Sequence, residues 1–220
     1  MKTLKKFTFF ISLFSLSSCF DLIEDVRFND DQSGSCKWTI NLSQNQLTLK
    51  SIQLLDSING YKVPDESFIR NYFNNIKDSL ELQEGISNVN YNLNFESYIF
   101  WLKYDFKDAK ALNKMGGIIS NKTEKNSISN NYFFETSNLF VKEFNVSNFF
   151  LNKYNKLKNE DKLIFKEANF ISICRFARTI KKTENPLFKM SKSKKAIMVK
   201  TPFLDVANGN VDLNCRISLN

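Results

Sequence analysis

The sequence contains no histidine, and it has only six glycines and three prolines among 220 residues. Without an imidazole the chain has no Ser-His-Asp or Cys-His catalysis, no histidine metal ligand and no histidine pH switch. No P-loop, dinucleotide-binding glycine motif, nucleophile elbow, zinc-protease helix or calcium loop is present either. These absences exclude the enzyme classes that are recognised by such motifs. We expect no cofactor and no metal site.

The sequence also lacks any apolar run of the ~20 residues that a transmembrane helix needs. Its most apolar stretch, residues 7–16, is shorter and follows three lysines within residues 1–6. This order is typical of a cleaved secretory signal. The stretch ends in Leu16-Ser17-Ser18-Cys19, which resembles the lipobox of bacterial lipoproteins, where an apolar residue and two small residues precede the lipid-modified cysteine.

The lipobox resemblance implies a signal peptide at residues 1–18 and a mature protein at residues 19–220, with Cys19 carrying palmitate-type acyl chains on its thiol and amino group. The expected partner is then the membrane, reached through the lipid on Cys19, and the expected location is the cell envelope. Phe20 stands where enteric lipoproteins retained at the inner membrane carry aspartate, which favours the outer membrane, on its periplasmic or surface face. The alternative is an ordinary secretion signal that happens to contain a cysteine.

The remaining composition is that of a globular domain, with 42% hydrophobic residues, 22 of them phenylalanine. The net charge of +8 includes the three leader lysines, and export argues against a nucleic-acid partner. The other cysteines, Cys36, Cys174 and Cys215, are odd in number and lie in apolar stretches. We expect buried thiols, with a Cys174–Cys215 bridge as the alternative.

Two neighbouring segments carry the strongest pattern. Residues 89–95 and 100–106 both alternate apolar and polar side chains, which predicts an antiparallel hairpin with one face packed and the other in water. A helix is predicted after Pro64, capped by Asp65 and ended by Gly85.

The other expected elements are predicted by weaker sequence patterns. They are a hairpin over 26–28 and 36–42, helices over 46–58, 108–115 (ended by Gly116-Gly117) and 148–158, a polar loop over 120–131, a charged break at 159–162, strands over 132–144, 170–179, 196–200 and 211–219, and a tight turn at Asn208-Gly209. Together they predict one α+β domain, an antiparallel β-sheet with helices packed on one face.

This layout resembles that of uncharacterised bacterial envelope lipoproteins, including those of the LppM type. The resemblance rests on the order of a lipid cysteine, a short hairpin, helices and the alternating hairpin. The late segments Phe176-Ala177-Arg178-Thr179-Ile180, Asn185-Pro186 and Ala196-Ile197-Met198-Val199-Lys200 complete it. It implies an envelope location and carries no catalytic residue.

On function, the sequence favours an envelope-anchored interaction or structural module, recognising an envelope protein or a lipid, over an enzyme. Candidate contacts are Trp101 and Lys103 on the wet face of the hairpin, and the loop at 120–131. One alternative is a histidine-free hydrolase that uses carboxylates or lysine. Another is a protein that holds lipid in an apolar cleft between sheet and helices.

The lipobox generates the first prediction. Cys19→Ala removes the only acylation site that the motif provides, so the chain should lose both palmitate labelling and sedimentation with membranes. Radiolabelling followed by membrane fractionation measures both effects, and Ser18→Ala is the matched control because it keeps a small residue before Cys19. An unmodified Cys19 in a freely soluble wild-type chain would contradict the prediction.

Overall fold

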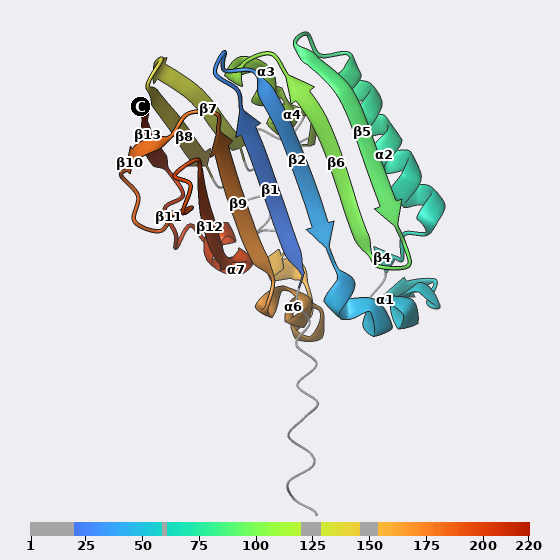
Figure 1. Ribbon diagram of the computed structural model, residues 1–220. Coiled ribbons are helices and arrows are strands. Elements are labelled where there is room, and N and C mark those ends of the chain that lie inside the picture. The colour runs from blue at the N-terminus through green and yellow to red at the C-terminus, as the bar shows by residue number, and fades with distance from the viewer. Residues whose placement is uncertain (1–19, 59–60, 120–128, 146–153) are drawn as a thin grey trace, which may run out of the picture.

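The computed structural model describes residues 20–58, 61–119, 129–145 and 154–220. Most strands belong to two sheets, one large and one small (Figure 1). The seven strands of the large sheet are β1 (Asp21–Phe28), β2 (Gly34–Asn41), β5 (Ile86–Asn94), β6 (Ile99–Phe106), β9 (Asn169–Phe176), β11 (Lys189–Met190) and β12 (Ala196–Pro202). The four strands of the small sheet are β7 (Ser129–Thr136), β8 (Leu139–Asn145), β10 (Ile180–Thr183) and β13 (Cys215–Leu219).

The large sheet has the strand order β11-β12-β9-β1-β2-β6-β5. All of its neighbours are antiparallel except β1 and β9, which run parallel with Glu24 beside Ser172 and Val26 beside Cys174. The expected sheet was wholly antiparallel, so this central pair corrects that detail. The chain reaches β9 only after a long crossover that includes β2, β5, β6 and two strands of the small sheet, β7 and β8.

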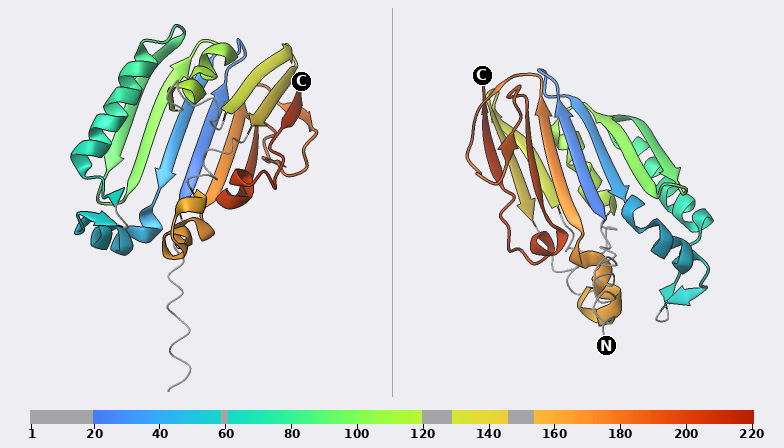
Figure 2. Two further views of the ribbon diagram at one scale, coloured as in Figure 1. Left: turned by 180° about the vertical axis from the view of Figure 1, so that it is seen from behind. Right: turned by 60° about the horizontal axis from the view of Figure 1, so that its bottom comes forward.

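The large sheet is covered on one face (Figure 2). Helix α2 (Glu66–Glu81) packs along β5, helices α3 (Ala109–Leu112) and α4 (Lys114–Ile119) lie behind β6 and β7, and the small sheet covers the region behind β1 and β9. The short elements η2 (Ser43–Asn45), α1 (Gln46–Gln53), β3 (Ser57–Ile58), β4 (Tyr61–Lys62), α6 (Asn159–Lys166) and α7 (Phe203–Ala207) complete the chain. The predicted α+β class with helices on one face is confirmed, and the small sheet is an addition to it.

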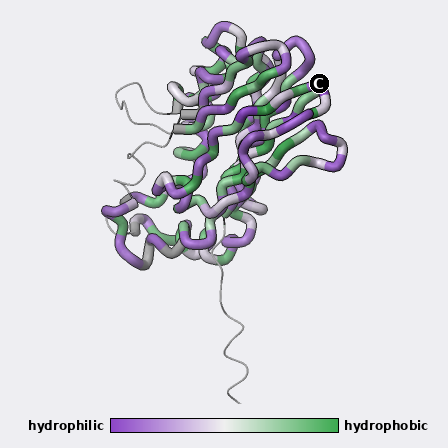
Figure 3. Tube along the Cα trace, turned by 90° about the vertical axis from the view of Figure 1, so that its left-hand side faces the viewer, coloured by the Kyte–Doolittle hydropathy of each residue, from purple (hydrophilic) through white to green (hydrophobic). Residues whose placement is uncertain are grey.

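The two strongest sequence patterns form the elements that they predict. β5 and β6 are antiparallel, and Val89, Leu93 and Leu102 are buried while the intervening asparagines are exposed. The same alternation of hydrophobic and hydrophilic residues is visible along the strands in Figure 3. Asp65 caps α2 by accepting a hydrogen bond from the Phe68 backbone N–H at 2.7 Å. Both sequence patterns predict the structure correctly, because burial of the apolar side chains favours the same elements as the local pattern does.

The single strand expected over residues 132–144 is wrong. The segment is a hairpin, in which Ser137 and Asn138 turn the chain between β7 and β8. The Asn138 backbone N–H donates to Thr136 Oγ1 at 3.3 Å and helps to hold this turn. Short side chains that bond nearby backbone groups favour turns over strands.

Several helix boundaries also differ. The helix expected over 46–58 ends at Gln53, and residues 57–58 pair with 61–62 instead. The glycines at 116–117, expected to end a helix, lie inside α4. The charged residues 159–162, expected to separate two elements, belong to α6, whose Phe165 packs on Phe20. Asn208-Gly209 ends α7, with Gly209 at φ +69°, and β13 begins only at Cys215. Of the helix expected over 148–158, residues 148–153 lie outside the described residues, as do residues 120–128 of the expected loop, and residues 129–131 belong to β7.

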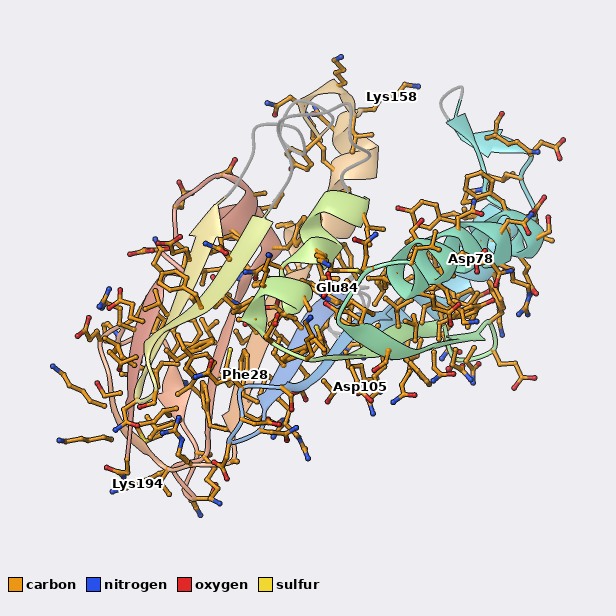
Figure 4. All side chains as sticks on the ribbon, turned by 90° about the horizontal axis from the view of Figure 1, so that it is seen from above. Phe28, Asp78, Glu84, Asp105, Lys158 and Lys194 are labelled. Atoms are coloured by element: carbon orange, nitrogen blue, oxygen red, sulfur yellow. The ribbon has the colours of Figure 1, made fainter. Side chains whose placement is uncertain are left out.

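Phenylalanine rings fill the space where the two sheets converge. Phe28 of β1 stacks on Phe176 with ring centroids 5.6 Å apart, and it also contacts Phe106, Phe134 and Phe140. Figure 4 looks down on this region, with Phe28 between the sheets. Aromatic pairs in such geometries contribute about 0.5–1.5 kcal/mol beyond their burial. Five of the phenylalanines thus form one aromatic cluster in the interface between the sheets.

The buried face of β6 generates a stability prediction. Leu102 is 3% exposed, so Leu102→Ala should lower the free energy of unfolding by about 2–5 kcal/mol through lost burial and a residual cavity. Asn92→Ala on the exposed side of β5 is the matched control and should change it by less than about 0.5 kcal/mol. Urea denaturation measures both, and equal losses would contradict the assigned faces.

Candidate functional site

A cavity of about 310 Å³ lies between the covered face of the large sheet and the layer that packs on it. Strands β1, β2, β6 and β9 form one wall, and α2, α3, α4, β7, β8 and α7 provide the other. The side chains that line it share a strongly apolar character: Leu22, Trp38, Ile40, Tyr72, Phe73, Ile76, Phe100, Leu102, Tyr104, Leu112, Met115, Tyr132, Phe144, Phe170, Phe203 and Val206, with Cys36, Gly116 and Glu24.

Glu24 is the one charged residue among those lining residues. The rim is marked by Tyr72 of α2, whose side chain is 49% exposed although it also lines the cavity. The far wall includes Tyr104, which is fully buried. The volume lies at the lower end of the ~300–1,000 Å³ found for small-molecule sites, which are likewise mostly apolar with a few polar groups.

The polar end of the cavity is a buried ion pair. Glu24 of β1 and Lys142 of β8 are each 1% exposed, and their Oε2 and Nζ atoms are 2.7 Å apart. Lys142 Nζ also donates to Ser172 Oγ at 2.6 Å, and Ser172 Oγ donates to Glu24 Oε2 at 2.9 Å. Tyr132 Oη donates to Glu24 Oε1 at 2.5 Å. The cluster thus joins the large sheet to the small one.

The hydrogen bonds of this cluster suit a charged lysine and a neutral tyrosine. Lys142 Nζ donates to two oxygens and lies 5.3 Å from the centre of the Tyr132 ring, a setting that suits an ammonium group. Burial, and next the Glu24 carboxylate, raise the pKa of the Tyr132 phenol well above its usual range. Tyr132 is therefore protonated at neutral pH and donates its hydrogen bond to Glu24.

Burial also dominates the three described thiols. It raises the pKa of Cys174 to about 12, and it raises the pKa of Cys36 well above its usual range with a further contribution from Glu24. Burial raises the pKa of Cys215 as well. All three are free and buried, so the expectation of buried thiols is confirmed and the Cys174–Cys215 bridge is not formed. Thiols with such raised pKa values are poor nucleophiles.

The residues predicted for binding lie elsewhere. Trp101 and Lys103 both point to the uncovered face of β6, as expected from the alternation, and neither lines the cavity. Trp101 is half-buried, with Lys37 Nζ 4.8 Å from its ring centre, and Lys103 is exposed. Cys19 lies outside the described residues. The structure therefore brings Trp101 and Lys103 together on one face and separates them from the concave site.

Sequence reasoning missed Glu24, Lys142 and Ser172. A signal exists for two of them, because Glu24 is in phase with Leu22, Val26 and Phe28, and Ser172 is in phase with Phe170 and Cys174. A polar residue at a core-facing position of a strand must find a partner. Lys142, the partner, follows Phe140 and Val141 in a strand that the sequence did not separate from its neighbour.

The chain matches no protein-family model and no curated protein. Its structure is similar to the NMR structure of the folded domain of LppM from Mycobacterium tuberculosis, with a TM-score of 0.46 and 8% sequence identity, over 91% of this chain and 89% of that chain. At 8% identity, no residue role passes from that domain to this chain.

None of the helices in the described ranges combines the length and apolarity needed to cross a bilayer. In the same ranges, no three acidic or cysteine side chains come together as metal ligands.

The ion pair generates a prediction by double-mutant cycle. Lys142→Met leaves the Glu24 carboxylate buried without its cation and should cost about 3–5 kcal/mol of unfolding free energy. Adding Glu24→Gln removes that charge, keeps one oxygen to accept from Tyr132 and offers an amide N–H to Ser172 Oγ, so the double variant should be more stable than Lys142→Met alone. Urea denaturation of the four chains gives the coupling, and strictly additive losses would contradict it.

Proposed function

We propose that this chain is a lipid-anchored envelope protein that binds a single acyl chain in the cavity between its two layers. The observation that supports this proposal most directly is the cavity. Its volume is about 310 Å³, and its one charged lining residue, Glu24, is already paired with Lys142. The lipobox-like Leu16-Ser17-Ser18-Cys19 supports the anchor and the envelope location, with the outer membrane favoured by Phe20.

The size of the cavity argues that it is occupied in use. Protein interiors are close-packed, with few voids larger than a water molecule. A cavity of about 310 Å³ is far larger than such a void, and its apolar lining offers water few hydrogen-bond partners. An apolar guest would displace that water and bury the lining.

The almost wholly apolar lining determines which kind of guest fits the cavity. A peptide or sugar would bring backbone or hydroxyl groups that this lining cannot satisfy, whereas an acyl chain brings none. Its polar head would remain at the rim, near the half-exposed Tyr72. The sequence favoured an interaction module, and we propose that its partner is a lipid. The face that carries Trp101 and Lys103 remains a second candidate surface, for an envelope protein.

The same geometry disfavours a hydrolase. Ser172 and Lys142 are 2.6 Å apart, as in a serine–lysine catalytic pair, but Nζ donates to both Ser172 and Glu24 and cannot act as a base while it does so. Neither Ser172 nor Lys142 lines the cavity, and both are buried. We therefore assign the cluster a structural role and no catalytic one.

The test uses cis-parinaric acid, a fluorescent fatty acid, with palmitate as competitor. The wild-type chain should bind one molecule and release it to palmitate. Ile76→Trp on α2 and Ile40→Trp on β2 each fill the cavity from an opposite wall, and each should weaken binding at least tenfold. Met198→Trp on the uncovered face of the large sheet is the control and should bind as wild type.

Denaturation curves establish that the variants are folded. Absence of saturable binding by the folded wild-type chain, or equal binding by the cavity variants and Met198→Trp, would refute acyl-chain binding in this cavity.

A further inference from the structure

The first residue of the fold is held tightly to the body. The Phe20 carbonyl accepts a hydrogen bond from the Asn169 backbone N–H at 2.9 Å. The Phe20 ring lies 5.7 Å from the rings of both Phe165 in α6 and Phe203 in α7. Cys19 precedes Phe20 directly, so their Cα atoms are about 3.8 Å apart. A lipid on Cys19 would therefore attach to the folded body with no flexible tether.

The strand register identifies the end of the molecule at which this attachment lies. Asp21 is paired with Asn41 at the end of β2 and with Asn169 at the start of β9. Helix α1 follows β2, and α6 precedes β9, so both lie at the same end as Phe20 (the lower end in Figure 1). Without a tether, this end must rest against the membrane that carries the anchor.

Helix α1 and the turn that follows it, residues 54–55, carry an apolar surface at that end. Leu47, Leu54 and Leu55 are 77%, 87% and 51% exposed. They are three of the nine large apolar side chains that are exposed in the described ranges, and they fall within ten consecutive residues. Leu49 and Ile52, on the other side of the helix, are half-buried, and Leu49 packs on the core. The helix thus has one apolar side in the protein and another in solvent.

We propose that the outer side of α1 is a membrane-contact surface, with Leu47, Leu54 and Leu55 entering the interface of the bilayer that holds the lipid on Cys19. This inference rests on the anchoring part of the proposed function and is independent of the cavity. Segment 43–58 contains one lysine, Lys50, and one acid, Asp56, so its charges cancel. Contact is therefore apolar, and high salt should not reverse it.

The experiment uses the full lipidated chain in vesicles of phosphatidylethanolamine and phosphatidylglycerol, carrying an environment-sensitive NBD label at Leu54→Cys. The control is Leu82→Cys. Leu82 is the same residue type with nearly the same exposure, 84%, and it follows α2 at the opposite end of the strands. Cys36, Cys174 and Cys215 are buried with raised pKa values and should not label in the folded chain.

We expect the label at position 54 to shift to the blue with a severalfold gain in intensity, and lipid-borne quenchers to reduce its fluorescence. The label at position 82 should keep its value in water.

The outcomes separate the two proposals. A wild-type chain that stays in the supernatant of sedimented vesicles overturns the anchor and this surface with it. A chain that sediments while position 54 remains in water overturns the surface alone. A label that is shielded in native envelopes but not in pure lipid assigns the surface to a protein and also overturns membrane contact.

Discussion

The buried pair of Glu24 and Lys142 is the interaction on which the two-layer arrangement depends. Two charges removed from water must meet in nearly ideal geometry, since their desolvation otherwise exceeds their attraction. Because Glu24 lies on β1 and Lys142 on β8, that requirement fixes how the small sheet sits on the large one. Hydrophobic packing of phenylalanine rings stabilises the contact, but it is less selective about register than a buried charge, which needs its opposite charge at one fixed place.

This constraint also explains why a cavity can exist beside the core. The phenylalanines around Phe28 and the ion pair hold the two sheets together behind β1 and β9, and α2 packs at the far edge along β5. The space between these attachments is spanned by the large sheet and is not filled by described side chains. An opening held from both sides can accept a guest without rearranging the fold.

The sequence predicted the elements in which local pattern and burial agree. The alternating asparagines of β5 and the Asp65 cap of α2 identify their elements unambiguously. It did not reveal the small sheet, because the turn between β7 and β8 lacks glycine and proline, so that residues 132–144 suggested one long strand. The ion pair was missed for a different reason, since 118 residues separate its two members and pairing at that distance is a property of the topology.

The parallel pairing of β1 with β9 also affects the order in which the chain can fold. β2 can pair with one edge of β1 as soon as residue 41 is made, but β9 arrives only about 148 residues after its partner. Contacts of such long range close slowly. The central strand of the finished sheet therefore begins as an edge with unpaired backbone groups. During synthesis, that edge needs protection from pairing with other chains.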